Sequence, residues 1–413
     1  MSLLRKNRIV LGACSLLALP TLTLACGPWL PNRLLDNGGK IILEAPEFYF
    51  ELEVKQIAQA QPVEFKAVPR GKNADGDVSY AQSNTEADLA DFADALAKGA
   101  IKPADAAKAK TEHEAARAFI NAPPDATSAL PEEFASEFAD YHRGALAYVR
   151  HQPDEARKIW QTLLARPAKE RHYRSIWAAY MLGRLELEAK DEVAAQKGFM
   201  TVQNLSKDGF ADSLGMAAAS FGWLARCKLD AHDLEGAAQL YLTQLACGDL
   251  TAVSSLDTVA EFAIPIPPTP SSDSDTPTPT PTPTPPPMAF PELAKTPILR
   301  KIISAYLLTH ETKNSGGDNE GDDSSAPSTS NPLLQSWLQA LEKAHLKTVE
   351  DADRLAWITY DTSDYKATHR WLKLAAPGSG LALWLSAKLD FRAGSLEKAT
   401  KELAAAVQQI PRR

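Results

Sequence analysis

The residues best suited to ligate a metal are eight histidines and four cysteines in a chain of 413 residues. His113-Glu114 begins an H-E-x-x-R sequence, which lacks the second histidine that a helical H-E-x-x-H zinc site requires. No histidines are paired at i,i+4 spacing, and there is no C-x-x-C pair. The remaining histidines include His142, His151, His172, His232 and His369. We therefore expect exposed histidines on helices or turns, and we predict no metal and no cofactor.

A serine and a lysine near the C-terminus have the spacing of a nucleophile. Ser395 to Lys398 fit S-x-x-K, the serine motif of penicillin-binding proteins and β-lactamases. The companion S-D-N and K-T-G motifs of those enzymes are absent from the sequence. Because Ser395 also stands where the last predicted helix needs an N-cap, we interpret it as a cap and predict no catalytic residue and no enzyme activity.

Two acidic stretches resemble cation sites but lack the right ligands. Residues 73–77 are similar to part of an EF-hand loop, yet its first ligand position falls on Gly71 and its twelfth on Gln82. The acidic residues between 318 and 323 lie among Gly and Ser, which is typical of a solvated loop.

Charge argues against a nucleic acid partner. The formal charge is −8, and removal of the N-terminal leader with Arg5, Lys6 and Arg8 brings it to −11. An acidic surface repels phosphate backbones.

The N-terminus has the pattern of an export signal. Residues 1–25 are a basic start followed by an apolar run from Ile9 to Ala25, interrupted by Pro20, which predicts a signal peptide. Ala25 before Cys26 resembles the lipobox of bacterial lipoproteins, although Thr23 and Leu24 depart from its preferred residues. The resemblance implies acylation of Cys26 and a membrane anchor through an N-terminal lipid. Cleavage without lipidation and an uncleaved anchor are the alternatives. We expect an exported protein of the periplasm or outer membrane.

The rest of the chain divides by composition. We predict a mainly α protein with a short β-containing N-terminal extension and two disordered loops. In the extension, Asn37-Gly38 indicates a hairpin turn and the alternation from Phe48 to Val54 indicates a strand. The predicted segments are the signal peptide (1–25), the extension (26–84), helical repeats (85–263), a Pro/Thr-rich linker (264–289), a helix (290–311), an acidic Ser/Gly loop (312–332) and further repeats (333–413). Since the helix at 290–311 cannot bury its own apolar face, we favour one continuous helical array over two domains.

Small residues recur where paired helices would cross. In the last repeat these residues, with a turn glycine and a closing proline, are Ala387, Gly394, Ala399, Ala406 and Pro411. Upstream copies contain the pairs Gly144 and Ala156, Gly183 and Ala195, and Ala225 and Ala237. This pattern resembles tetratricopeptide repeats, which implies a solenoid of α-hairpins. The alanines at 156, 195 and 237 are 39 and 42 residues apart, longer than the family period of ~34 residues, so these repeats are degenerate.

The remaining cysteines and tryptophans are interpreted as core. Cys227 and Cys247 would lie roughly 15 Å apart in a helical hairpin, too far for a disulfide. Seven tryptophans fall in predicted helices, at 160, 177, 223, 337, 357, 371 and 384.

We expect a non-enzymatic scaffold that binds a protein or peptide. The alternatives are a carbohydrate-binding surface protein using exposed tryptophans, and a hydrolase.

Overall fold

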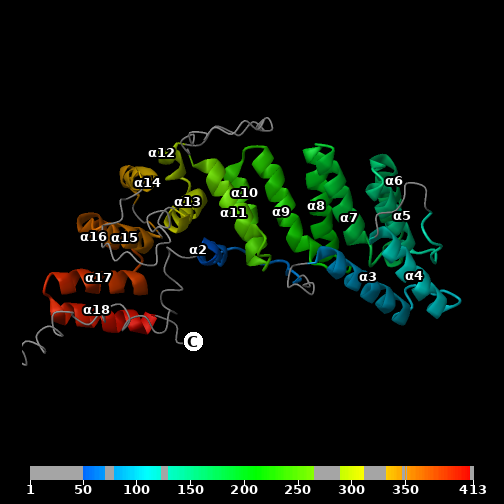
Figure 1. Ribbon diagram of the computed structural model, residues 1–413, viewed down its shortest axis with the longest axis horizontal. Coiled ribbons are helices and arrows are strands. Elements are labelled where there is room, and N and C mark those ends of the chain that lie inside the picture. The colour runs from blue at the N-terminus through cyan, green and yellow to red at the C-terminus, as the bar shows by residue number, and fades with distance from the viewer. Residues whose placement is uncertain are drawn as a thin grey trace, which may run out of the picture. The chain divides into compact units, whose positions relative to one another are not determined.

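The computed structural model describes residues 50–69, 79–121, 129–264, 289–310, 332–346, 349 and 351–409. All regular secondary structure in these ranges is helical (Figure 1). The first helices are α2 (Phe50–Ala58), α3 (Tyr80–Ala97), α4 (Ala106–Asn121), α5 (Glu137–Val149), α6 (Pro153–Leu164), the short 3₁₀ helix η2 (Ala168–Glu170), α7 (Ser175–Glu188), α8 (Glu192–Lys207) and α9 (Met216–Asp230). They are followed by α10 (Leu234–Ala246), α11 (Ala252–Ala263), α12 (Phe290–Leu293), α13 (Pro297–His310), α14 (Pro332–Lys343), α15 (Ala352–Asp361), α16 (Tyr365–Leu372), α17 (Gly380–Arg392) and α18 (Leu396–Gln409). The prediction of a mainly α protein is confirmed.

Helices that are neighbours in the sequence pack against each other. The pairs are α5 with α6, α7 with α8, α9 with α10, α15 with α16, and α17 with α18. Helices α6 and α8 also pack on α7 and α9, the first helices of the pairs that follow them, and Figure 1 shows α7 to α11 side by side. This arrangement is consistent with a helical-repeat solenoid.

The turn inside each pair has a repeated backbone geometry. One residue with positive φ is followed by the residue that precedes or caps the second helix. The positive-φ residues are His151 (55°), Lys190 (62°), His232 (63°), Ser363 (63°) and Gly394 (79°). In three of the five turns, the next residue is an aspartate: Asp191, Asp233 or Asp364. Its side chain accepts a hydrogen bond from the backbone N–H three residues later. Only the last turn uses glycine, so four of the five hold a side chain in the left-handed region.

Small residues lie where the helices come closest. A Cβ added to Gly144 on α5 would stand 2.3 Å from the Trp160 indole of α6. On α8, a Cβ on Gly198 would stand 2.7 Å from the Gly183 Cα of α7. The predicted small residues of the helices are buried: Gly144, Ala156, Gly183, Ala195, Ala225, Ala237, Ala387, Ala399 and Ala406. Pro411 lies outside the described residues.

The predicted strand at 48–54 is wrong for its described part. Residues from Phe50 onward form α2, in which Phe50, Val54 and Ala58 recur every fourth residue and are buried. They join the apolar cluster of α10, α11 and α13, and Glu53 pairs with Arg354 at 3.1 Å. Alternation over a few residues also fits i,i+4 spacing, and a helical partner surface favours the helix. Asn37-Gly38 lies outside the described residues.

One apolar cluster includes helices on both sides of residues 265–288. In α13, Ile302, Ile303 and Leu307 have no exposed surface and pack with α10 and α11. From α14, Trp337 enters the same cluster, and its indole N–H donates to Ser304 Oγ at 3.2 Å. The apolar face at 290–310 therefore has the helical partners that the sequence required.

One further sequence prediction concerns the cysteines. Cys227 and Cys247 are both free and buried, so the prediction that they form no disulfide is confirmed. Within the described ranges, none of the helices combines the length and apolarity needed to cross a bilayer.

Candidate functional site

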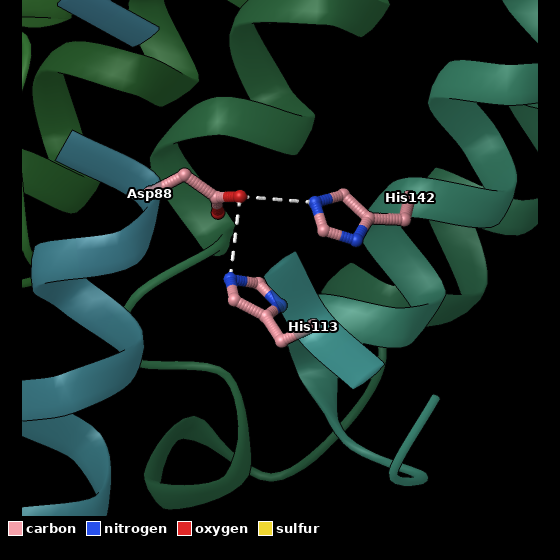
Figure 2. A group of neighbouring side chains, drawn as sticks. All are labelled: Asp88, His113 and His142. Atoms are coloured by element: carbon pink, nitrogen blue, oxygen red, sulfur yellow. Dashed lines mark hydrogen bonds and ion pairs between the residues drawn. The ribbon is translucent and has the colours of Figure 1, made fainter. Parts of the chain in front are cut away.

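Three helices bring ionisable side chains together in the interior. Asp88 on α3, His113 on α4 and His142 on α5 have no exposed side-chain surface and point toward one another (Figure 2). Asp88 Oδ2 lies 3.1 Å from His142 Nε2 and 3.3 Å from His113 Nε2. On the other side of both rings, the Glu133 carboxylate lies 2.6 Å from His113 Nδ1 and 3.0 Å from His142 Nδ1. We call these four residues the Asp–His centre.

Each helix presents its member of the centre on an apolar face. Asp88 lies one turn before Phe92, and His142 one turn after Phe138. The ring of His113 stacks on that of Phe92 with centroids 4.0 Å apart and meets Phe138 edge-on at 5.4 Å. The same packing that forms the core of this region thus buries the polar groups.

Two guanidinium groups complete the surroundings of Asp88. Arg174, just before α7, is fully buried, with Nη2 2.5 Å from Asp88 Oδ1 and Nη1 2.7 Å from Asp91 Oδ2. Its guanidinium also lies over the rings of Phe138 and Trp177. The Arg117 Nε is 3.9 Å from Asp88 Oδ2.

The electrostatics of the centre favour charged forms despite burial. Burial would raise the pKa of Asp88, but Arg174 and the two histidines hold that pKa well below its usual value. The pKa of Glu133 is lowered in the same way, because both histidines outweigh its burial. Burial alone would lower the pKa of His113, but the carboxylates of Asp88 and Glu133 raise it.

Glu137 shows the opposite balance. Burial raises the pKa of its carboxyl to about 7, although the side chain accepts backbone N–H bonds from Tyr173 at 2.9 Å and Arg174 at 2.6 Å. This residue therefore changes charge near neutral pH, close to an arginine that the centre depends on.

One nitrogen of the centre lacks a hydrogen bond. His113 Nε2 is buried without a hydrogen-bond partner, since its 3.3 Å contact with Asp88 does not have hydrogen-bond geometry. Chemically, the centre has two carboxylates facing four imidazole nitrogens. It can hold extra protons on the histidines or a cation between them.

The sequence prediction for these histidines was wrong. His113 and His142 are fully buried, whereas His151, His232 and His369 are exposed as expected and His172 is half-buried. The sequence signal is the aromatic residue one turn from Asp88 and from His142. A spacing of i,i+4 does not reveal the centre, because its side chains come from three helices.

The remaining sequence candidates do not converge on the centre. Ser395 is exposed directly before α18, and Lys398 pairs with Asp390 at 2.9 Å. Cys26, the 73–77 stretch and the acidic residues at 318–323 lie outside the described residues.

The tryptophans fall into two classes. Trp160, Trp177, Trp337 and Trp371 are buried core residues, while Trp223, Trp357 and Trp384 are half-buried. Trp357 and Trp384 stack with centroids 4.8 Å apart, and the Lys388 ammonium lies 3.8 Å from the Trp384 centroid. Trp223 stacks on Phe199 and has the Arg184 guanidinium over its ring at 4.8 Å.

Comparison with known proteins adds no family: neither the models of protein families nor the curated protein sequences match this chain.

Proposed function

We propose that this chain is an exported, non-enzymatic scaffold of the cell envelope that holds another protein or an extended peptide on stacked helix pairs. The leader at 1–25 supports export, and Cys26 after Ala25 supports an anchor through an N-terminal lipid in the periplasm or outer membrane. The tetratricopeptide-like placement of small residues supports a solenoid, an architecture whose exposed helix faces commonly bind peptides.

The observation that carries this proposal is a segment of the chain lying on its own helices. Residues 61–69 have no regular secondary structure and contact α8, α9 and α10 through Glu64, Phe65 and Gln61. Ala67 N–H donates to Cys247 O at 2.8 Å, the Phe65 ring lies 5.9 Å from that of Phe221, and Lys207 pairs with Glu64 at 2.8 Å. These helices thus offer backbone, aromatic and ionic groups to an extended segment.

A second surface of similar chemistry lies on α15 and α17. Trp357 and Trp384 are half-buried beside Lys388, and the Arg392 guanidinium lies 4.2 Å from the Tyr365 centroid. Aromatic rings with adjacent cations are typical of protein interface hot spots. We propose this patch, named the Trp357/Trp384 patch, as the contact surface for an acidic partner segment.

Site-specific photo-crosslinking tests the scaffold proposal. A photoreactive amino acid at Trp384 should give an adduct of one defined mass in envelope extracts. The matched control places the same group at exposed Glu397 on α18, where no such adduct is expected. The absence of an adduct at Trp384, together with a purified protein that is monomeric and retains no partner, would contradict the proposal.

Carbohydrate binding is the alternative, because half-buried tryptophans can stack on sugar rings. Lys388 lies over Trp384, and Arg184 and Phe199 lie against Trp223, so a sugar must compete with side chains of the same chain. We therefore expect glycan titrations to leave tryptophan fluorescence unchanged in the wild type. Saturable quenching of tryptophan fluorescence by a glycan, absent in Trp384→Ala, would favour the carbohydrate-binding hypothesis.

The anchor has a separate test. Intact mass of the protein from the membrane fraction should include a lipid adduct that is lost in Cys26→Ser. The same mass for both proteins would remove the lipid anchor and leave the helix-face proposal untouched.

A further inference from the structure

We propose that Asp88, His113 and His142 bind one divalent transition-metal cation, with Zn²⁺ the best fit, and that this ion ties α3, α4 and α5 together. The proposal concerns the interior and is independent of the scaffold function.

The two nitrogen–oxygen separations of the ligand atoms fit a small coordination sphere. Asp88 Oδ2, His113 Nε2 and His142 Nε2 all lie within 4.8 Å of one another, and the two nitrogens are 3.3 and 3.1 Å from the oxygen. Ligands about 2.0 to 2.1 Å from a tetrahedral zinc ion are about 3.3 to 3.4 Å apart. Figure 2 shows both Nε2 atoms directed at the same carboxylate oxygen.

Glu133 and Arg174 hold the three ligands in place from behind, as carboxylates that hydrogen-bond ligating histidines do in zinc proteins. Each Nδ1 lies at hydrogen-bond distance from one Glu133 oxygen, 2.6 Å for His113 and 3.0 Å for His142. Donation of Nδ1–H to Glu133 leaves the Nε2 lone pairs facing Asp88. Arg174 binds the other Asp88 oxygen, so Oδ2 is the one directed at the histidines.

Without a cation, this arrangement places lone pairs against a negative oxygen. His113 Nε2 is the evidence for this unfavourable contact, because the atom is fully buried and has no hydrogen-bond partner. A buried polar atom of this kind is costly unless something occupies the space it faces. The remaining way to satisfy both rings is a second proton on each imidazole, and the experiment below distinguishes the two.

The local charge favours a cation. The carboxylates of Asp88, Asp91 and Glu133 outnumber the guanidiniums of Arg117 and Arg174, and Glu137 is not counted because burial raises its pKa to about 7. Two nitrogens and one carboxylate oxygen suit Zn²⁺ better than Ca²⁺ or Mg²⁺, which prefer all-oxygen sites.

Metal content and stability of the full-length protein test the proposal. After treatment with a chelator and long equilibration with Zn²⁺ alone, native mass spectrometry should find one zinc per chain and the Tm should rise by several degrees, whereas Mg²⁺ has no effect. His142→Gln should lose this zinc, and Glu133→Gln should weaken binding about 10- to 100-fold. His369→Gln, at an exposed histidine, should bind zinc as the wild type does.

Cobalt keeps the test decisive if the variants do not fold. Co²⁺ bound by the wild type should give the visible absorption of a four- or five-coordinate nitrogen and oxygen site, displaced by Zn²⁺. No metal uptake by the folded wild type, or uptake that His142→Gln leaves unchanged, would overturn the proposal. Stability that falls as the pH rises, without any metal uptake, would also overturn it and would assign the centre to ion pairs of protonated His113 with Asp88 and Glu133.

Discussion

The region around α3, α4 and α5 and the region from α9 to α17 have different kinds of core. The first buries an aspartate, two histidines and Arg174 among its aromatic rings. The second is built mainly from side chains such as Leu256, Ile302 and Trp337, none of which has exposed surface. Apolar burial is worth about 25 cal/mol per Å² and needs no particular partner. A buried charge depends on each of its partners. The second region also buries a few charges, such as Arg300 and Asp353, but in the first region they face one another at the centre of the core. We therefore expect the first region to be the more sensitive to single changes, to pH and to ions.

The largest expected effect comes from removing Arg174. Arg174→Met keeps much of the side-chain volume but leaves Asp88 and Asp91 without their closest positive group. Breaking a buried ion pair from one side costs about 3 to 5 kcal/mol, and we expect a loss of that size in the free energy of unfolding. Urea denaturation followed by circular dichroism measures it.

The matched change is Arg184→Met on α7. Arg184 is partly exposed, pairs with Glu188 at 3.5 Å and lies over Trp223, so we expect a loss of no more than about 1 kcal/mol. Equal losses in the two variants would mean that the buried network contributes no more than a surface pair, and the expected sensitivity of the first region would lose its basis.

The sequence predicted the regular part of the molecule because close helix packing restricts residue size. Gly144 faces Trp160, and Gly198 meets the backbone of Gly183, so neither site tolerates a larger side chain without movement. Such restrictions repeat with the helix pairs and are visible as a period. Four of the five turns were less visible, because His151, Lys190, His232 and Ser363 adopt positive φ without being glycine.

The Asp–His centre was not predicted, because it has no local spacing. Asp88, His113 and His142 come from three helices and meet only in the folded chain. H-E-x-x-R lacks the second histidine of a helical zinc motif, yet His113 is buried in the centre and Arg117, the last residue of this stretch, faces Asp88. Polar residues on an otherwise apolar helix face were the usable signal.

The pH dependence of stability sharpens the comparison through Glu137. Its folded-state pKa of about 7 is above the ordinary value of 4.5. The stabilisation of the folded state by this carboxyl is therefore present in full below about pH 4.5, and it is lost as the pH rises through 7. Glu137→Gln keeps an oxygen that accepts the N–H groups of Tyr173 and Arg174 but cannot ionise. Between pH 5 and 8 the variant should lose about 1 to 3 kcal/mol less stability than the wild type.

Leu256→Ala is the control from the apolar region. We expect it to cost about 2 to 5 kcal/mol at every pH, with a profile parallel to that of the wild type. If Glu137→Gln also runs parallel to the wild type between pH 5 and 8, the carboxyl is not neutral in the folded protein and the pH sensitivity of the first region lies elsewhere.

The smallest expected effect concerns a feature that both regions have, the positive-φ turn between paired helices. His151 follows α5 beside the charged core, Ser363 follows α15 in the apolar one, and both have positive φ in equivalent turns. The left-handed conformation costs a non-glycine residue about 1 to 2 kcal/mol, and the entropy that glycine adds to the unfolded chain offsets part of the gain. His151→Gly and Ser363→Gly should therefore each stabilise by about 0.5 to 1 kcal/mol, whereas His151→Ala, which keeps the strain, should not. The strain is local to the turn. Equal gains in the free energy of unfolding for His151→Gly and Ser363→Gly would therefore show that the two regions differ in their cores and not in their turn geometry. A gain in only one variant would show that the core determines the conformation of the turn.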